Sequence, residues 1–425
     1  MKKINIGLIG FGTVGQGVYE VLQKNNSLIK KRKGVSLKIK KICDLKVGAV
    51  KKMAPKIEVV KNWESLVNDP GIDLIVELIG GIKPAKDIIL KSLKQGKGVV
   101  TANKKLLAEK GEDIFRIAGE SKSFLGFEAA IGGGMPCLLA LESGLVGNEI
   151  RLITGILNGT TNYILTQMEN NPQASFTDVL REAQIKGFAE LDPTFDIEGF
   201  DAGHKIALLA MLAYNSKIDF KSLSIEGITK INQLDIINAK EMGYKIKLLG
   251  IAKIIDGKLD LRVHPTMIPG KHPLAAVHNE FNAIMFEGDM TDPILIYGKG
   301  AGSHPTASAV VSDLVQMARP GGADLIRMPI KKKISLLPSK DRFSKYYLRI
   351  HTEDSPGILA KIAAVLGRYG ISIASVLQKQ SPQKYVPIII MTHQAAESKI
   401  LTAIDKIKKL SFVDKEIIFI RVEDF

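Results

Sequence analysis

A glycine-rich turn near the start of the chain constrains the fold more than any other feature. The alternating apolar run INIGLI is followed by Gly10, Gly12 and Gly15 and by a helical stretch from about Gly12 to Lys24. In such a GxGxxG turn the first glycine permits a tight bend, the second admits a pyrophosphate, and the third lets the helix pack on the strand. The helix N-terminus then offers free N–H groups to the phosphates. The motif predicts a dinucleotide site, and a plain strand–helix turn is the weaker interpretation.

Strands and helices alternate through the first third of the chain. The segments LKIKKICD, IDLIVELIG, GVVTANK and SFLGFEAA are strand-like, and amphipathic stretches lie between them. This alternation is typical of an α/β fold with a doubly wound parallel sheet of the Rossmann type. The nearly continuous apolar run IDLIVELI fits a strand that is buried on both faces.

The pattern changes after about residue 131. Longer helices and a strand-rich stretch predict an α+β domain, and the last eighty or so residues follow a ferredoxin-like βαββαβ order. We expect the following boundaries: a dinucleotide-binding domain at 1–131, the α+β domain at 132–304, a helix returning to the Rossmann domain at 305–325, a linker at 326–345 and the ferredoxin-like domain at 346–425.

The net charge of +15 is concentrated early in the chain. Residues 30–61 contain twelve Lys or Arg against only Asp44 and Glu58. No zinc finger, helix-turn-helix signature or interleaved aromatic residues accompany them, so we expect a solvated face near an anionic ligand and no nucleic acid. The chain has no apolar run of about 18 residues, no signal-type segment, and two widely separated cysteines. We therefore expect a cytoplasmic protein without a membrane partner.

The end of the second predicted strand bears on the choice of cofactor. Asp44 stands where an acid bonds the ribose 2′-hydroxyl of NAD and repels the 2′-phosphate of NADP. Its distance in sequence from Gly15 is longer than usual, and nearby lysines would attract a 2′-phosphate. Those lysines are Lys41, Lys46, Lys51 and Lys52. The sequence favours NAD slightly and leaves NADP open.

The segment GFAELDPTFDIEGFDAGHK contains the strongest candidates for chemistry. Asp201 and Lys205 are four residues apart at the start of an apolar helix and so share a face. A lysine beside carboxylates can donate or accept a proton. The surrounding acidic cluster suits a substrate ammonium better than a metal, because no His or Cys stands at ligand spacing. The cluster comprises Glu190, Asp192, Asp196, Glu198 and Asp201. We expect His204 to be a packed or exposed neighbour of Lys205 rather than a ligand.

A second lysine stands where open parallel sheets bind ligands. Lys104, in VVTANKK, follows the C-terminal end of a predicted strand. The chain therefore offers two lysines, Lys104 and Lys205, as candidates for contact with a substrate.

Six motifs in order resemble homoserine dehydrogenase: GFGTVGQGV, VVTANKKLLA, EAAIGGGMP, GILNGTTNYIL, GFAELDPTFDIEGFDAGHK and AGSHPTASAVVSDL. The resemblance runs from residue 1 to about 320, and it implies that the α+β domain at 132–304 is the catalytic, substrate-binding and dimerisation domain. It implies reversible interconversion of L-homoserine and L-aspartate 4-semialdehyde with NAD or NADP, in the biosynthesis of threonine, methionine and isoleucine.

The resemblance also implies roles for individual residues. Lys205 matches the proton-transferring lysine, Lys104 a lysine near nicotinamide and substrate, and Glu190, Asp196 and Asp201 the acids around the amino group and the lysine. The implied cofactor contacts are Gly10, Phe11, Gly12, Thr13, Val14, Gly15, Asp44, Thr101, Lys104, Gly300 and Gly302. A monovalent cation, sodium, is implied at Glu128, Ile131, Gly133 and Met135, largely through main-chain carbonyls. Lys299 stands where the family usually has proline.

The C-terminal segment, with the turn Asp354–Gly357 entering a helix and GISI after it, resembles an ACT domain. Such domains pair edge to edge, which implies a homo-oligomer, a dimer or a tetramer. The resemblance implies threonine as a feedback ligand, and a pairing module without a ligand stays open.

Two other functions compete with this interpretation. A semialdehyde dehydrogenase that forms a thioester would need an activated cysteine, but Cys137 lies in an apolar helical setting that raises a thiol pKa. A non-catalytic amino-acid sensor would need neither the lysines nor the acids, and both are present.

Overall fold

The computed structural model describes residues 2–318, 333–379 and 384–425, and these form two compact units. Unit 1 comprises Met1–Gly159, Asp201–Leu223 and Phe281–Ile334, and unit 2 comprises Thr160–Phe200, Ser224–Glu280 and Ser335–Phe425. Parts of the expected returning helix and of the expected linker, residues 319–325 and 326–332, lie outside the described residues. Among the described residues, no helix has the length and apolar character needed to cross a membrane.

The first sheet of unit 1 is parallel throughout, as predicted. Its described strands follow the order β3-β2-β1-β4-β5-β6, which is the doubly wound arrangement. The strands are β1 (Lys2–Ile9), β2 (Val35–Cys43), β3 (Glu58–Val60), β4 (Leu74–Glu77), β5 (Gly98–Thr101) and β6 (Leu125–Gly126). The helices are α1 (Thr13–Lys33), α2 (Val47–Met53), α3 (Glu64–Val67), α4 (Ala85–Lys94), α5 (Lys104–Lys110), α6 (Glu112–Ser121) and α13 (Ser303–Met317).

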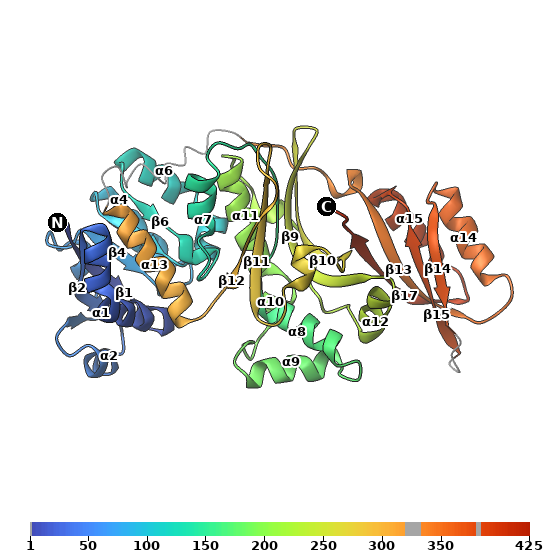
Figure 1. The fold of residues 1–425 in the computed structure, drawn as a ribbon, viewed down its shortest axis with the longest axis horizontal. Coiled ribbons are helices and arrows are strands. Elements are labelled where there is room, and N and C mark those ends of the chain that lie inside the picture. The colour runs from blue at the N-terminus through green and yellow to red at the C-terminus, as the bar shows by residue number, and fades with distance from the viewer. Residues whose placement is uncertain (1, 319–332, 380–383) are drawn as a thin grey trace. The chain divides into compact units, whose positions relative to one another are not determined.

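Helices cover both faces of this sheet. On one face α1 and α13 lie side by side (Figure 1) and bury Val18 and Leu22 against Val310 and Leu314. On the other face Ile88 of α4 packs in a separate cluster of buried residues under the sheet. The three layers explain why the central strands β4 and β5 are buried along their whole length.

Helix α1 is longer than predicted. It continues past Lys24 to Lys33 and ends at Gly34, whose φ of 69° gives the left-handed conformation that commonly terminates helices. Its last turns are polar and basic, so they lack the apolar periodicity from which a helix is predicted. Basic side chains at Lys30 to Lys33 suit the negative end of the helix dipole. Part of the basic segment of the sequence is thus the exposed end of α1.

Unit 1 also contains three antiparallel strands in the order β12-β11-β7. Their bounds are β7 (Ile150–Ile156), β11 (Phe281–Gly288) and β12 (Ile294–Lys299). Shorter helices lead into this region: η1 (Glu128–Ala130), α7 (Cys137–Leu139) and η2 (Ala140–Gly144). Helix α11 (Phe200–Ala213) carries Asp201 and Lys205 and is buried from its second residue through Met211.

Unit 2 contains a sheet in the order β9-β10-β17-β13-β15-β14. Strand β8 also pairs with β10, and β16 with β13. The strands are β8 (Ser224–Ile225), β9 (Tyr244–Ile255), β10 (Lys258–Pro269), β13 (Phe343–Glu353), β14 (Ile373–Gln378), β15 (Tyr385–Thr392), β16 (Ala395–Ala396) and β17 (Val413–Val422). The helices are α8 (Gly159–Asn170), α9 (Phe176–Ile185), α10 (Thr194–Ile197), α12 (Gln233–Glu241), α14 (Ile358–Arg368) and α15 (Glu397–Ile407), with short 3-10 turns η3 (Phe220–Ser222, in unit 1), η4 (Pro273–Ala276) and η6 (Ser339–Asp341).

The last eighty residues have the predicted βαββαβ order, with α14 and α15 packed on their sheet through Ile362 and Ile404. This sheet does not stop at its own edge. Its strand β17 pairs in parallel with β10, with Arg421 opposite Thr266 and Val422 opposite Met267. The C-terminal domain therefore shares a continuous sheet with the β9–β10 hairpin of unit 2.

Candidate active site

The glycine turn after β1 has the geometry that its motif predicts. Gly10 has a φ of 94°, which is strained for any residue with a side chain. A Cβ on Gly15 would lie 2.2 Å from the main-chain oxygen of Gly10. Only glycine at this position therefore allows the start of α1 to pack against the turn. A Cβ on Gly12 would meet no atom within 4 Å. Packing within the protein therefore explains two of the glycines, and Gly12 borders open space at the helix N-terminus.

Asp44 lies directly beside this turn. Its Oδ2 accepts a hydrogen bond from the Phe11 N–H at 2.8 Å, and its Oδ1 accepts one from the Lys46 N–H at 2.8 Å. The carboxylate thus joins the end of β2 to the glycine turn, despite the long separation in sequence. Thr13 and Val14 follow as the first residues of α1.

Glu77, which the sequence analysis overlooked, organises the neighbouring strand ends. This buried carboxylate accepts a hydrogen bond from Thr101 Oγ1 at 2.6 Å and from the N–H groups of Ile79 and Gly80 at 2.9 and 3.1 Å. It links the C-terminal ends of β4 and β5, directly before Lys104. An acid inside the apolar run IDLIVELI was the available signal, because a buried carboxylate requires partners.

Two lysines meet at one carboxylate in unit 1. Asp201 Oδ1 lies 3.0 Å from Lys104 Nζ, and Asp201 Oδ2 lies 2.8 Å from Lys205 Nζ. Asp201 and Lys205 share a face of α11, as their spacing predicted, while Lys104 comes from the start of α5. The side chains of Asp201 and Lys205 are 6% and 8% exposed, and that of Lys104 is 31% exposed. Lys104 is therefore the more accessible of the two amines.

The polar surroundings of this cluster favour the ionised carboxylate. Burial alone would raise the pKa of Asp201, but the charges of Lys205 and Lys104 and a 3.0 Å hydrogen bond from Asn158 Nδ2 hold that pKa well below its usual range. One carboxylate is thus shared by two ammonium groups. The excess positive charge would attract an anionic or electron-rich oxygen of a bound molecule.

Main-chain contacts fix the direction of the Lys205 side chain. Lys205 Nζ donates to the carbonyl oxygen of Leu157 at 2.7 Å, and Asn282 Nδ2 donates to the same oxygen at 2.8 Å. An ammonium group has three N–H donors. The bonds to Asp201 and Leu157 use two of them, so a third N–H can serve a substrate oxygen. Asn158 and Asn282 were not predicted as site residues from the sequence, although Asn158 lies within the motif GILNGTTNYIL.

Glu190 and Asp196 belong to unit 2. Asp196 Oδ2, on α10, lies 3.0 Å from Thr160 Oγ1, which also lies 2.6 Å from the carbonyl oxygen of Phe188. Glu190 is exposed, and its carbonyl oxygen accepts a hydrogen bond from Gln184 Nε2 at 3.0 Å. Both residues follow the end of α9 and precede α11.

The late glycine turn of unit 1 returns to the start of α1. Gly302 has a φ of 120°, and the next residue, Ser303, donates from Oγ to the carbonyl oxygen of Thr13 at 2.8 Å. A Cβ on Gly300 would collide with Asn282 Nδ2 at 2.0 Å. Lys299 lies over the ring of Phe281, with Nζ 5.8 Å from its centroid.

The residues matched to a cation site lie in one tight turn. Gly133 has a φ of 57°, and a Cβ there would lie 2.3 Å from the carbonyl oxygen of Gly300. The Glu128 carboxylate accepts hydrogen bonds from the N–H groups of Leu138 and Leu139 at 2.8 and 3.0 Å. In the part of the chain that the structure describes, no three His, Cys, Asp or Glu side chains are grouped to hold a metal ion.

Two neighbouring groups are unsuited to catalysis. Burial, followed by the charge of Glu128, raises the pKa of the Cys137 thiol well above its usual value, which disfavours a thiolate nucleophile. His204 is packed rather than exposed: its ring stacks on Phe220 at 4.1 Å, and its Nε2 lies 2.9 Å from Glu109 Oε1.

Comparison with known proteins shows the family to which the chain belongs. The family model described as homoserine dehydrogenase matches residues 136–315, its NAD-binding domain matches 10–128, and the ACT domain matches 346–412. Homoserine dehydrogenases of Neisseria gonorrhoeae and Helicobacter pylori are 44% and 42% identical, over 100% of this chain and 99% and 100% of theirs. The crystal structure of a homoserine dehydrogenase from Thiobacillus denitrificans is 41% identical, with a TM-score of 0.94 over 100% of this chain and 99% of that one.

A parallel sheet with a glycine turn, followed by a lysine–carboxylate cluster, defines a nicotinamide-dependent oxidoreductase. The chain belongs to the homoserine dehydrogenase family, and it interconverts L-homoserine and L-aspartate 4-semialdehyde. This result favours the dehydrogenase over the thioester-forming enzyme and the non-catalytic sensor. A hyperthermophilic archaeal homoserine dehydrogenase mutant in complex with NADPH is also similar, with 26% identity and a TM-score of 0.63 over 74% of this chain and 97% of that one.

Proposed function

We propose that Lys205 transfers the proton at the oxygen of the reacting carbon and that Asp201 and Lys104 position it. The observation that carries this proposal is the bridge made by Asp201, 2.8 Å from Lys205 Nζ and 3.0 Å from Lys104 Nζ. In the reducing direction Lys205 donates a proton to the aldehyde oxygen as hydride reaches the carbon, and in the oxidising direction it receives the alcohol proton. A nicotinamide cofactor supplies or accepts the hydride when bound.

The rigid surroundings of Lys205 support this role. Asp201 and the Leu157 carbonyl oxygen fix two of its N–H bonds, so the third has a defined direction. Lys104, more exposed and attached to the same carboxylate, is placed to contact the substrate oxygen or the nicotinamide. Fixed donors around a developing charge lower a barrier without having to reorganise during the reaction.

Glu190 and Asp196 hold the amino group of homoserine in this proposal. Asp196 is oriented by Thr160, and Glu190 is exposed and available to a ligand. Charge-assisted hydrogen bonds from an ammonium group to these carboxylates would orient the amino alcohol. In this arrangement Asp201 contacts the two lysines and does not bind the substrate amino group.

The cofactor lies on the glycine turn between β1 and α1 in this proposal. The open space beside Gly12 and the free N–H groups of the α1 N-terminus suit a pyrophosphate. Thr101, Gly300 and Gly302 complete the nicotinamide end of this site. The position of Asp44 beside the turn supports NAD, with NADP as the alternative, and a higher kcat/KM with NAD than with NADP would bear this out.

A monovalent cation, sodium, is held by the turn that contains Ile131, Gly133 and Met135. Main-chain carbonyl oxygens are hard donors of the kind that hard cations prefer, and the left-handed Gly133 lies in the short segment that contains all three residues. Burial raises the pKa of the Glu128 carboxyl, and the amide hydrogen bonds from Leu138 and Leu139 oppose that shift and favour its ionised form near this turn.

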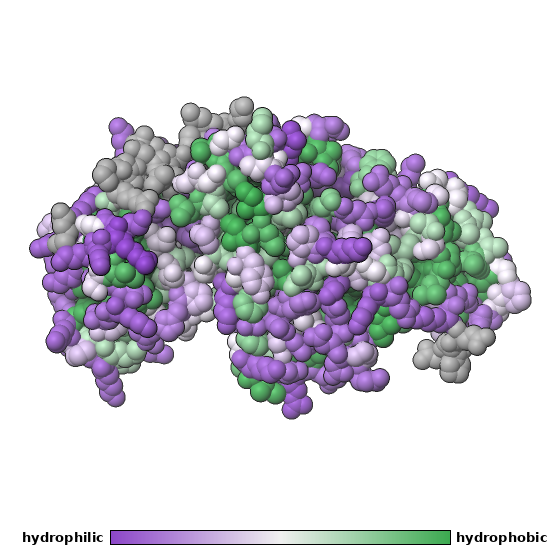
Figure 2. Space-filling view, viewed as in Figure 1, coloured by the Kyte–Doolittle hydropathy of each residue, from purple (hydrophilic) through white to green (hydrophobic). Residues whose placement is uncertain are grey.

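The ACT domain pairs the chain into a homo-oligomer and binds threonine as a feedback inhibitor. Strand β14 is the last strand in the sheet order, and most of its residues are exposed. Figure 2 shows hydrophobic colour near β14 and α14, where Val376 and Leu359 are 39% and 38% exposed. An exposed edge with apolar side chains is a surface on which a second sheet can pair.

One assay tests the main parts of this function. Absorbance of the reduced nicotinamide is followed with homoserine and NAD or NADP, with sodium or choline as the cation, and with or without threonine. We expect homoserine-dependent reduction that is faster in sodium and slower with threonine. An equal turnover rate in sodium and in choline would contradict the proposed cation role. An equal rate with and without threonine would mean that the ACT domain serves only as a pairing module.

A further inference from the structure

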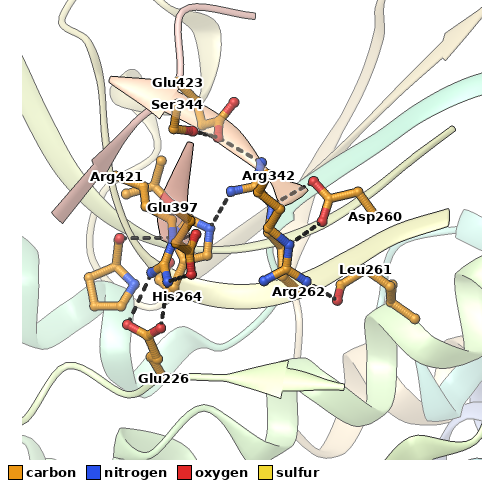
Figure 3. Close-up of polar contacts among 12 residues, drawn as sticks. Glu226, Asp260, Leu261, Arg262, His264, Arg342, Ser344, Glu397, Arg421 and Glu423 are labelled. Carbon is orange, nitrogen blue, oxygen red and sulfur yellow. Dashed lines mark hydrogen bonds and ion pairs between the residues drawn. The ribbon is translucent and has the colours of Figure 1, made fainter. Parts of the chain in front are cut away.

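A cluster of buried charges joins the C-terminal domain to strands β8 and β10 within unit 2. Figure 3 shows three arginines surrounded by carboxylates that come from different elements. The arginines Arg262, Arg342 and Arg421 are 4%, 5% and 2% exposed. The carboxylates are those of Glu226, Asp260, Glu397 and Glu423. Buried charges of this kind persist only when they are paired, so the contacts that they make are well defined.

Arg421, near the end of β17, holds two carboxylates at once. Its Nε and Nη2 donate to Glu397 Oε2 and Oε1 at 2.8 and 2.6 Å. Its Nη1 and Nη2 donate to Glu226 Oε2 and Oε1 at 3.1 and 2.8 Å. The planar guanidinium suits such paired bonds and fixes both carboxylates in orientation. Glu397 belongs to the C-terminal domain, whereas Glu226 directly follows β8.

The turn that begins at Glu226 is bonded to the helix that carries Asp196. The Glu226 N–H donates to the Val263 carbonyl oxygen at 2.8 Å, and the Ile228 N–H donates to the Ile197 carbonyl oxygen at 2.8 Å. Between them, a Cβ on Gly227 would lie 2.2 Å from that Ile197 oxygen. The turn 226–228 therefore packs tightly against the end of α10, one residue from Asp196.

Arg421 adds a side-chain anchor to the main-chain bonds that hold this turn. The turn borders a cavity of about 440 Å³, lined also by Lys230 and by Asp405 and Lys408 from the α15 side. The Glu226 side chain remains 39% exposed beside this cavity, in contrast to the 3% of Glu397. Loss of the Arg421–Glu226 bonds would leave the turn held by its main-chain bonds alone beside this cavity, while Arg421 would keep its buried partner Glu397.

We propose that Arg421 and Glu226 are positioning residues for substrate binding. Through the turn 226–228 they hold α10, and with it Asp196, in the orientation that receives the amino group of homoserine. A change in the C-terminal sheet thereby reaches the substrate site through this ion pair, in addition to the pairing of β17 with β10. The inference rests on the proposed function of Asp196, and it adds a structural link that this function does not itself require.

The variant Glu226→Gln tests the link because it keeps the shape of the side chain and removes its charge. Glu423→Gln is a matched control: Glu423 accepts a 2.7 Å bond from Arg262 in the same cluster but forms no bond with the turn 226–228. Coupling of this kind typically changes an equilibrium by about 3- to 30-fold, so we expect KM for homoserine to rise within that range in Glu226→Gln with kcat nearly unchanged. We expect wild-type KM in Glu423→Gln, with a similar change in melting temperature in both variants.

Hydrogen exchange gives a readout that does not depend on activity. Amide exchange in the peptide covering 194–199 should accelerate in Glu226→Gln and remain at the wild-type rate in Glu423→Gln. Wild-type exchange in Glu226→Gln, or equal acceleration in both variants, overturns the proposed link. If Asp196→Asn leaves KM for homoserine unchanged, the assignment of Asp196 fails instead, and the exchange comparison still decides whether Arg421 holds α10 through Glu226.

Discussion

The most informative single substitution is Lys205→Met, because it keeps an unbranched apolar stem of similar length and removes the ammonium group, the proposed proton donor. The change removes the 2.8 Å bond to Asp201 and the 2.7 Å bond to the Leu157 carbonyl oxygen. General acid–base catalysis contributes about 10²–10⁴-fold to a rate, so kcat should fall by that factor, a barrier increase of about 3–5 kcal/mol. Steady-state reduction of nicotinamide with saturating homoserine measures kcat.

Measurements of stability and of cofactor affinity distinguish a loss of catalysis from misfolding of the Lys205→Met variant. Removing one partner of a buried ion pair costs about 3–5 kcal/mol, and the cost here should be smaller because Asp201 keeps Lys104 and Asn158. We therefore expect a folded protein with wild-type affinity for NAD(P)H, measured by fluorescence titration. Lys186→Met is the control, since Lys186 forms an exposed pair with Glu182 at the same four-residue spacing and should keep wild-type kcat. A Lys205→Met enzyme within about threefold of wild-type kcat would refute the role of Lys205.

Three further predictions address the glycine turn, the cysteine and a buried lysine. Gly12→Ala should keep the wild-type melting temperature and lose affinity for NAD(P)H. Gly15→Ala, whose Cβ would lie 2.2 Å from the Gly10 oxygen, should lower the melting temperature. The opposite pattern in thermal unfolding and fluorescence titration would contradict this prediction. Cys137→Ser should retain most of the wild-type kcat, because burial disfavours its thiolate, and an inactive folded variant would restore the thioester mechanism. Burial lowers the pKa of Lys247 to about 8, so the unfolded chain binds more protons above that pH and folding gains stability as pH rises. The unfolding free energy of wild type relative to Lys247→Met, measured with denaturant, should increase by about 2 kcal/mol between about pH 8 and about pH 9.5, and a constant difference would contradict the shifted pKa.

The parts of the fold that depend on local chemistry were predictable from the sequence. The glycines fixed the start of α1, and the four-residue spacing of Asp201 and Lys205 placed both on one face of α11. The end of α1 was missed because its polar last turns face solvent and are terminated by Gly34 rather than by a change in apolar periodicity. Spacing could not predict that Lys104 would meet Asp201, since that contact depends on how distant elements pack.

The buried charges on β10 show where an alternating pattern misleads. Asp260, Arg262 and His264 alternate with apolar residues, which is typical of a strand with one solvated face. All three are nevertheless at most 4% exposed, because β17 pairs beside β10 and Arg421 and Arg342 lie over the same face. Asp260 and Arg262 pair with each other, but their further partners Arg342 and Glu423 are 82 and 161 residues away in the chain, so the complete neutralisation was not visible in any local segment.

A crystal structure of the enzyme with homoserine and a nicotinamide cofactor bound tests the proton-transfer site most directly. We expect the homoserine hydroxyl oxygen to lie within hydrogen-bond distance of Lys205 Nζ. Asp201 should still bridge Lys205 and Lys104. The substrate amino group should contact Glu190 and Asp196. A hydroxyl oxygen that lies out of reach of Lys205, or a substrate amino group bound by Asp201 in place of the lysines, would contradict it.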